Sequence, residues 1–251
     1  GDQEKVFQEL ETLFRVETGG WEKLQSPHEG VEMAIKKKDQ QGKKIGIALG
    51  RAEGTADCTA EEAAAWYFEY CSRERMAVDR EEGNHARLEI SNREERVNEN
   101  VFATVKKMPF PLHKRKFVFR NIWARKSVES VSVACASVDK SIDFGGGLGK
   151  LVIGQTKSIF TATNIDAEGD GHGLPRCKIE QFQYLDAGGH IPVSLVNRKI
   201  PESLGTVGDI AKSFKRDEEI DKVELARLTE IIRNEEQEYN DDERRAIRDG
   251  K

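Results

Sequence analysis

Residues 181–197 read Gln-Phe-Gln-Tyr-Leu-Asp-Ala-Gly-Gly-His-Ile-Pro-Val-Ser-Leu-Val-Asn, and this stretch decides the fold. Its paired glycines supply a turn after an extended segment, and Pro192 suits the first position of a helix. Beyond Pro192, apolar residues recur every three or four positions, which predicts an amphipathic helix. They are Val193, Val196, Ile200, Leu204, Val207, Ala211 and Phe214. Three residues are expected to kink or loosen this helix: Pro201, Gly205 and Gly208.

The rest of the chain predicts the elements that this helix covers. Residues 3–16 have helical periodicity, and a second helix opens where Thr59 and Glu62 form a capping box. Apolar alternation predicts strands near 31–35, 45–49, 86–90, 101–105, 117–123, 131–137, 150–164 and 176–186. The strand at 117–123 is apolar on both faces and is expected to be central. Short connections favour antiparallel neighbours, so we expect about eight strands in a single meandering sheet. The fold class is therefore α+β: a curved antiparallel sheet grips the long C-terminal helix.

The charge of the chain is unevenly distributed. The 251 residues carry a net charge of -5, but residues 215–249 hold 13 Asp/Glu and 8 Lys/Arg, so the preceding part is nearly neutral. Together with the predicted elements, this change in charge near residue 215 divides the chain into three parts. They are an N-terminal helix in 1–20, an α+β domain in 21–215 and a charged helical extension in 216–251. Two interpretations of the extension stay open: a solvated linker to another domain, and a coiled-coil or docking helix.

Composition excludes several classes of function. A near-neutral domain lacks the basic excess of a nucleic-acid-binding protein, so we expect no nucleic-acid partner. No apolar run approaches the ~20 residues of a membrane-spanning helix. The cysteines are widely spaced, which indicates free thiols in a reducing compartment and favours a cytoplasmic location. They are Cys58, Cys71, Cys135 and Cys177.

Motifs for catalysis and metal binding do not fit. The glycine-rich segment 145–150 is not a phosphate loop, because Phe144 and Leu151 stand where that motif needs a glycine and a hydroxyl residue. It is interpreted as a mobile loop. The acidic segment 166–172 lacks the spacing of a helix-loop-helix calcium site, which favours a polar loop and leaves calcium as the alternative. No nucleophile elbow is present. We therefore expect no enzyme, no metal and no cofactor.

Three features together resemble the START family, the steroidogenic-acute-regulatory-related lipid transfer domains. Residues 112–120, Leu-His-Lys-Arg-Lys-Phe-Val-Phe-Arg, look like the family's Arg-Asp-Phe-Val strand entry, with Lys116 at the aspartate position. Residues 181–197 match its last strand, its Asp-x-x-Gly-x-Ile-Pro turn and its closing helix. The order of elements over 20–214 is the third feature. The resemblance implies a helix-grip fold, with a tunnel or cavity between the sheet and the C-terminal helix.

The resemblance also implies a site with a polar end and an apolar lining. Arg87 and Asn121 are expected near the polar end, because related domains often place a charged or polar pair there. The lining is expected from Val133, Phe182, Tyr184, Val196, Ile200 and Val207. Ordinary core packing is the alternative for each apolar residue, and exposure to solvent is the alternative for Arg87.

The expected function is the binding of a single lipid, such as a sterol or a phospholipid, for lipid transfer or lipid sensing. Expected partners are this lipid, a membrane in transient contact and other domains of a longer parent protein. The alternative is a ligand-sensing regulatory or interaction module that signals through the C-terminal helix. A third hypothesis, an enzyme on the same grip fold, has no motif in its support.

Overall fold

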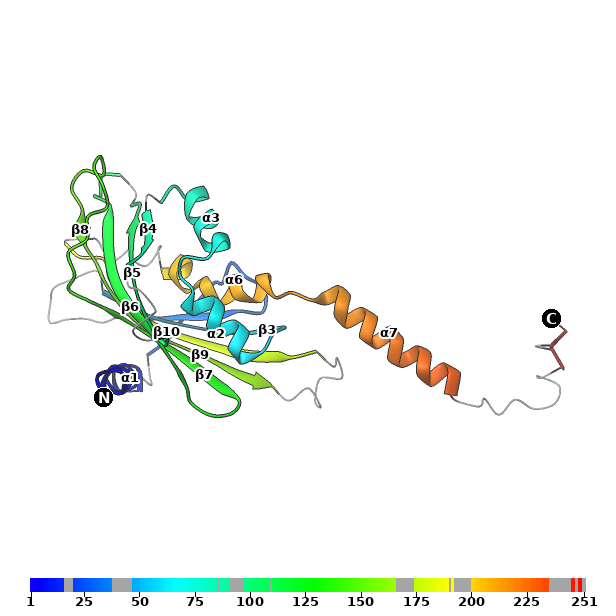
Figure 1. The fold of residues 1–251 in the computed structure, drawn as a ribbon. Helices are drawn as coiled ribbons and strands as arrows, with labels where there is room; N and C mark the ends of the chain where they lie inside the picture. Colours follow the sequence, from blue (N-terminus) through cyan, green and yellow to red (C-terminus); the bar gives the residue numbers. More distant parts are fainter. Residues whose placement is uncertain are drawn as a thin grey trace. The chain divides into compact units, whose positions relative to one another are not determined.

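One sheet organises the protein, whose computed structural model is shown in Figure 1. The described residues are 1–15, 20–37, 47–84, 86–90, 97–108, 110–165, 174–189, 191, 200–234, 245–246 and 248–249. The strands are β1 (Glu22–Leu24), β2 (Glu32–Lys37), β3 (Ile47–Ala56), β4 (Ala86–Glu89), β5 (Glu99–Lys106), β6 (Arg115–Arg125), β7 (Ser130–Ser137), β8 (Val152–Ile153), β9 (Gln155–Ile165) and β10 (Arg176–Asp186).

The strand order is β1-β2-β3-β10-β9-β7-β6-β5-β4, and β8 pairs with β6. The sheet is antiparallel as predicted, except that β8 runs parallel to β6. It has ten strands, and it is not a simple meander, because β3 pairs with β10 along ten positions. This crossover places an early strand next to the strand that leads into the closing helix. β6 lies between β5 and β7, toward one side of the sheet, whereas the most central strand is β9.

Five helices are described from end to end: α1 (Asp2–Arg15), α2 (Ala60–Phe68), α3 (Arg73–Glu81), α6 (Thr206–Ser213) and α7 (Asp217–Asn234). Residues 200–204 are helical as well. The capping box of α2 is confirmed, since Thr59 Oγ1 accepts from the Glu62 N–H at 3.2 Å and Glu62 accepts from the Thr59 N–H at 2.8 Å. The sequence did not predict α3, which begins after the N-cap Ser72. Its nine residues, Arg-Glu-Arg-Met-Ala-Val-Asp-Arg-Glu, are mostly charged and have a weak apolar period.

The sheet has two covered faces, which Figure 1 shows with α2 and α6 on one side and α1 on the other. We call the first the grip face and the second the outer face. Alternate strand residues point to opposite faces, so the grip face receives Val133 and Phe160 and the outer face receives Ile122 and Ile159. Because both faces are packed, β6 is buried on both sides, which explains its doubly apolar sequence.

The closing helix approaches β3 closely. Residues 200–204 are helical, the helix is interrupted at Gly205 as predicted, and α6 follows; residues 192–199 lie outside the described part. A Cβ at Gly50 would lie 2.9 Å from a Leu204 methyl, and one at Gly54 would lie 3.2 Å from a Val207 methyl. The glycines of β3 therefore let the helix rest on the strand backbone.

The grip domain comprises Gly1–Ile165 and Pro175–Lys215. α7 belongs to a second compact unit, in which it is the longest described helix. It carries charged residues on most of its surface, together with exposed apolar side chains at Leu225, Leu228, Ile231 and Ile232. Across the described ranges, no helix combines the length and the apolarity that crossing a bilayer requires.

Candidate functional site

A row of polar side chains crosses the grip face. Cross-strand pairing places Asn100 opposite Asn121, Asn121 opposite Cys135, Cys135 opposite Ser158, and Ser158 opposite Gln183. Residues paired in this way share a face of the sheet, so the five side chains form one line from β5 to β10. All but the half-buried Gln183 are buried. We call this line the polar row.

Tyr67 of α2 covers the middle of the polar row. Its hydroxyl hydrogen-bonds the Ser158 hydroxyl at 2.9 Å, and its ring stacks on Phe160 with a centroid separation of 4.3 Å. Burial raises the pKa of the Tyr67 phenol well above its usual value, and it raises the pKa of the Cys135 thiol to about 12. Both groups are therefore neutral at physiological pH and act as hydrogen-bonding groups.

Two buried acceptors on the grip face have no hydrogen-bond partner among the described residues: Asn121 Oδ1 and Gln181 Oε1. The Asn121 amide nitrogen donates to the Phe68 carbonyl at 3.3 Å, and the Gln181 amide nitrogen has a long contact of 3.5 Å with Gln183. A buried acceptor without a partner costs about 1–3 kcal/mol. A hydrogen-bond donor that reaches either atom, from a ligand or from water, would remove this cost.

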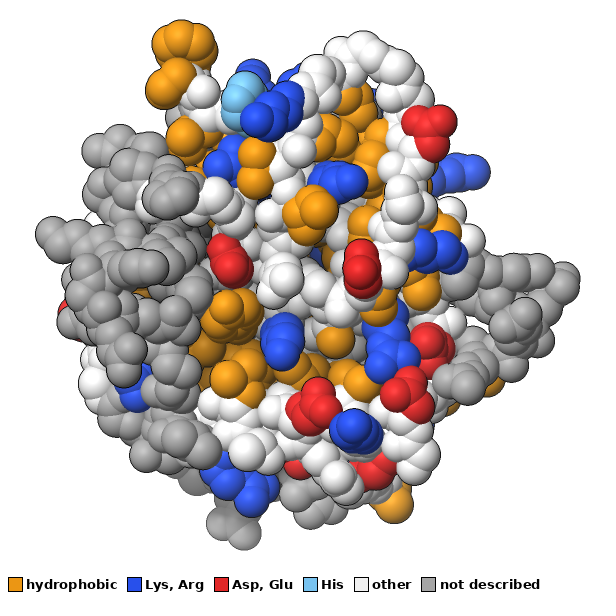
Figure 2. Space-filling view, turned by 90° about the vertical axis from the view of Figure 1, so that its left-hand side faces the viewer, with side chains coloured by type: hydrophobic (Ala, Val, Ile, Leu, Met, Phe, Trp, Pro, Cys, Tyr) orange, Lys and Arg blue, Asp and Glu red, His pale blue; other side chains and the backbone are white. Residues whose placement is uncertain are grey.

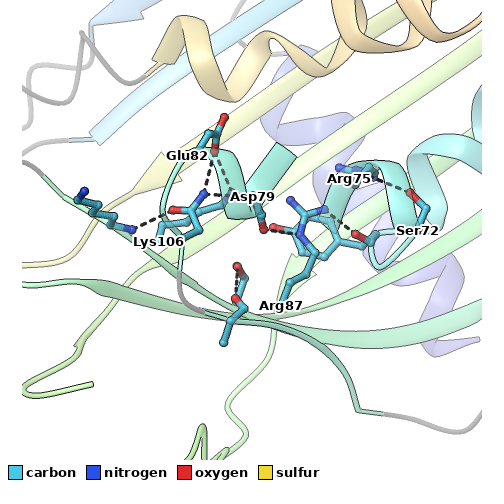
Figure 3. Close-up of polar contacts among 11 residues, drawn as sticks. Ser72, Arg75, Asp79, Glu82, Arg87 and Lys106 are labelled. Carbon is cyan, nitrogen blue, oxygen red and sulfur yellow. Dashed lines mark hydrogen bonds and ion pairs between the residues drawn. The ribbon is translucent and has the colours of Figure 1, made fainter. Parts of the chain in front are cut away.

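Arg87 lies at the edge of the grip face, where Figure 3 shows it directed toward α3. Its Nε donates to Asp79 at 2.5 Å, a second nitrogen donates to the Tyr70 carbonyl at 2.5 Å, and its guanidinium lies 3.8 Å from the Tyr70 ring centroid. Lys106 also donates to Asp79, at 2.5 Å. The sequence analysis placed Arg87 with Asn121 at the polar end of a site; in the structure Arg87 and Lys106 bind Asp79 and fasten α3 onto β4 and β5.

The charges of this cluster are stable. Burial alone would raise the pKa of Asp79, but the hydrogen bonds from Arg87 and Lys106 outweigh it and hold that pKa below its usual value. Burial opposes the charge of Arg87 as well, yet the electrostatic effect of Tyr70 and the Asp79 hydrogen bond leave its pKa raised. Asp79 and Arg87 are each less than one-tenth exposed. Both therefore stay ionised and bound to each other.

Arg115 fastens the turn that leads to the closing helix. It is 3% exposed, and its Nε donates to the Ala187 carbonyl at 2.8 Å, while its other nitrogens reach the carbonyls of His113 and Gly188. Gly188 has a φ of 65°, and a Cβ there would collide with the Ile153 carbonyl oxygen. Backbone carbonyls thus hold Arg115, the first arginine of the 112–120 segment.

Comparison with solved structures identifies the architecture. Human StAR-related lipid transfer protein 5 is 17% identical to this chain, with a TM-score of 0.58, and the match covers 84% of this chain and 95% of that chain. The human StarD13 lipid transfer and protein localization domain is 16% identical, with a TM-score of 0.55, and covers 84% and 96% respectively. A STAR-related lipid transfer protein from Xanthomonas axonopodis is 15% identical, with a TM-score of 0.52, and covers 82% and 99%.

This chain has the START fold. The resemblance seen in the sequence is therefore confirmed at the level of architecture, including the helix-grip class. No model of a known protein family matches the sequence, and no curated protein matches it either.

The START grip brings some of the predicted lining residues together. Val133, Ile200 and Val207 are buried in one cluster, which the sheet, α2 and the closing helix form together. Asn121 is buried on the same face, three strands from Gln181, and the sequence analysis missed Gln181. Val196 lies outside the described residues.

Phe182 and Tyr184 lie on the opposite face, so they do not line the space under the closing helix. Phe182 packs on Phe14 of α1, with ring centroids 5.6 Å apart, and on Trp21, at 6.2 Å. Along β10 the grip face receives the intervening residues, Gln181, Gln183 and Leu185. The error arose because β10 has aromatic residues on a face that α1 covers, so hydrophobicity alone did not identify the inner face.

The resemblance implies a tunnel between the sheet and the closing helix, but the open space in the structure lies on the other face of the sheet. The gap between β3, β10 and residues 200–204 is lined by Gly50, Leu185 and Leu204 and has no room for a water molecule. On the outer face, an open groove beside α1 has a volume of about 370 Å³ and is lined by Phe14, Phe182 and serine and threonine hydroxyls of β7 and β9. Within the described ranges, no cluster of three or more His, Cys, Asp or Glu side chains is arranged to hold a metal.

Proposed function

We propose that this chain binds one lipid molecule between the grip face and the closing helix, for lipid transfer or lipid sensing. The observation that carries the proposal is the polar row on an otherwise apolar face, with its two unpartnered acceptors. An amphiphile matches both properties, because its chain replaces apolar contacts and its polar end supplies the missing hydrogen bonds.

The chemistry of these groups favours a particular polar end. Asn121 Oδ1 and Gln181 Oε1 accept hydrogen bonds, and the arginines around this face already have partners: Arg75 donates to the Trp66 and Tyr67 carbonyls, Arg87 to Asp79, and Arg115 to backbone carbonyls. A lipid whose polar end carries hydroxyl or amide donors, such as a sterol or a ceramide-like molecule, suits these acceptors.

Entry of the lipid requires the grip to open. The closing helix rests directly on Gly50 and Gly54, and the gap beside residues 200–204 admits no water. The interruption at Gly205 separates residues 200–204 from α6, so the two pieces can move separately. Movement of a covering segment to admit a ligand is a common gating mechanism. Exchange of the lipid with a membrane in transient contact is part of this proposal.

Native mass spectrometry and fluorescent-sterol titration of the full chain test the proposal, with Gln181→Leu as the variant. The variant removes Gln181 Oε1, an acceptor that would gain a hydrogen bond only when lipid is bound, so its affinity for lipid should fall about five- to tenfold. The same change should leave the free protein as stable or up to about 1 kcal/mol more stable. Glu180→Leu, the neighbour on the outer face, is the matched control and should bind normally. Absence of any bound lipid, or equal weakening by both variants, would contradict the proposal.

One observation favours a second candidate function, a regulatory module that acts through its C-terminal extension. Leu225, Leu228 and Ile232 follow one another at helical spacing on α7 and are 62%, 52% and 68% exposed. Such a stripe is typical of a helix that packs on a partner. Deletion of residues 217–251 should then abolish self-association or partner binding and leave lipid binding intact. Unchanged association after the deletion would exclude this candidate.

A further inference from the structure

Two of the cysteines are in contact in the core beneath α2. The Sγ atoms of Cys58 and Cys177 lie 3.8 Å apart, although the two positions are separated by 119 residues in the chain. Both side chains are 0% exposed and belong to the cluster on the grip face. Cys135, by contrast, pairs across the sheet with Ser158, and Cys71 is only half-buried. The wide spacing of the cysteines in the sequence did not indicate this contact.

The backbone holds the two thiols next to each other. Cys177 lies on β10, where it pairs with the last residue of β3, and Cys58 follows that residue by two positions. An ion pair joins the same two segments one residue earlier, since Arg176 Nε lies 3.3 Å from Asp57 Oδ1. The proximity of the thiols therefore follows from the pairing of β3 with β10, which extends along ten positions.

The chain neighbours of both cysteines reach solvent. Asp57, Thr59 and Arg176 are half-buried, and Lys178 is exposed. The pair lies near the start of β10, and the opposite end of the sheet carries β8 and faces the viewer in Figure 2, where hydrophobic, basic and acidic side chains are intermixed on the surface. Ends of elements open locally at a lower free energy than the core of a sheet. A small opening at the start of α2 would thus expose a thiol to a small oxidant.

We infer that Cys58 and Cys177 form a reversible disulfide within the chain when the protein meets hydrogen peroxide. The first thiolate attacks one peroxide oxygen and the O–O bond breaks, which leaves a sulfenic acid and, after proton transfer, one water molecule. The sulfur of the second thiol then attacks the sulfenic sulfur, the S–O bond breaks, and a second water molecule leaves as the S–S bond forms. Two electrons pass from the thiols to the peroxide.

The contact favours the disulfide over further oxidation. A disulfide has an S–S length of about 2.0 Å, so the sulfurs need to approach each other by less than about 2 Å, which rotation of the side chains can supply. Because the second thiol is already in contact, it can capture the sulfenic acid before another peroxide molecule oxidises it. In a reducing compartment the thiols are the resting state, and small thiols return the disulfide to them by exchange.

The disulfide would fasten the start of α2 to β10. Cys58 precedes the N-cap Thr59, and the Ala60 N–H donates to Asn164 Oδ1 at 2.7 Å, which already connects this point to β9. α2 carries Tyr67 over the polar row. A covalent link would restrict movement of α2 away from the sheet. Slower exchange of lipid would follow, and this consequence alone rests on the proposed function.

Oxidation of the full chain with dilute hydrogen peroxide tests the inference. Remaining thiols are blocked with a maleimide in urea, and the peptides are mapped by mass spectrometry. We expect most chains to carry a peptide in which Cys58 is linked to Cys177, and dithiothreitol should remove the link. Since the link closes a long loop, the Tm of the oxidised chain should rise by on the order of 10 °C, and reduction should reverse the rise.

Three variants sharpen the test. Cys58→Ala and Cys177→Ala should each lose both the linked peptide and the rise in Tm. Cys71→Ala is the matched control, because Cys71 is the more accessible thiol, and it should form the link to the same extent as the unchanged chain. Circular dichroism verifies that each variant is folded. The peptide map of the unchanged chain gives a result that does not depend on the variants.

Three results would overturn the disulfide site: no linked peptide after oxidation, a link that joins other cysteines or two chains, or an equal loss of the link in Cys71→Ala. Native mass spectrometry of the oxidised and reduced chains separates this inference from the proposed function. Formation of the Cys58–Cys177 link in a chain that binds no lipid would support the disulfide site and contradict the interior lipid site.

Discussion

The two faces of the sheet differ in two properties: whether their polar groups have hydrogen-bond partners, and how much open space they leave. The grip face carries buried amides and hydroxyls, yet the gap beside its closing helix admits no water. The outer face has an open groove of about 370 Å³, but its polar groups are satisfied: Ser132 and Thr161 bond each other at 2.9 Å, and Lys126 pairs with Glu11. Polar groups that lack partners, and not free volume, are therefore the observation on which the proposed binding face depends.

This difference also assigns separate roles to the helices. α1 packs firmly on the outer face through Phe7, Leu10 and Phe14, and the face behaves as a hydrophobic core. On the grip face, α2 supplies Tyr67 to the polar row, and the closing helix is interrupted at Gly205. The outer face is packed as a core, and the grip face is the one on which the proposed opening would take place.

The largest expected effect comes from a matched pair of substitutions on the two faces. Phe160→Ala removes a fully buried ring stacked on Tyr67 and should lower the free energy of unfolding by about 3–5 kcal/mol. Phe182→Ala removes a half-buried ring on the outer face and should cost about half as much. Urea denaturation measures both. An equal or greater loss for Phe182→Ala would show that the outer face is the main core.

The next effect concerns the cluster that fastens α3 to the edge of the grip face. Asp79→Ala leaves buried Arg87 without its carboxylate partner and Lys106 with only Glu82, at 3.9 Å, and should destabilise the protein by about 3 kcal/mol. The folded-state pKa of Asp79 is lowered from an unfolded value of about 3.9. The contribution is therefore complete above about pH 4 and declines as the pH falls through the folded-state pKa.

Denaturation at pH 7 and at pH 3 measures this contribution in the unchanged protein and in Asp79→Ala. The difference between the two proteins should shrink at the lower pH. Asp139→Ala, at an exposed position, is the control and should change stability little. A constant difference at both pH values would contradict the assigned role of the charge.

The sequence predicted correctly those features that depend only on residues close together in the chain. The capping box at Thr59 and the interruption at Gly205 depend on neighbouring residues, and the structure confirms both. The face of β10 was predicted wrongly, because Phe182 and Tyr184 look as suitable for a lining as Val133 does. Only the register with β9 and β3, set by residues far away in the sequence, shows that Gln181 points inward.

The role of Arg87 was predicted in part for a related reason. Its position on the grip side of β4 follows from alternation, but its partner Asp79 lies in α3, which the sequence analysis missed. Ser72 followed by a charged segment was the available signal, since serine is a preferred N-cap. The apolar period of that segment was too weak to predict a helix, because one side of α3 faces solvent.

The smallest expected effect uses the cysteines as reporters of the grip face, where all four lie. Burial raises the pKa of the Cys71 thiol to about 11 and that of Cys135 to about 12, and Cys58 and Cys177 are buried with their sulfurs 3.8 Å apart. Since the thiolate is the reactive form, and an ordinary thiol has a pKa of about 8.5, alkylation at pH 8 should be on the order of 100-fold slower than in urea. Half-buried Cys71 should react first. Rapid labelling of Cys135 in the free folded protein would show that the grip stands open without ligand, and the distinction between a closed inner face and an open outer groove would then fail.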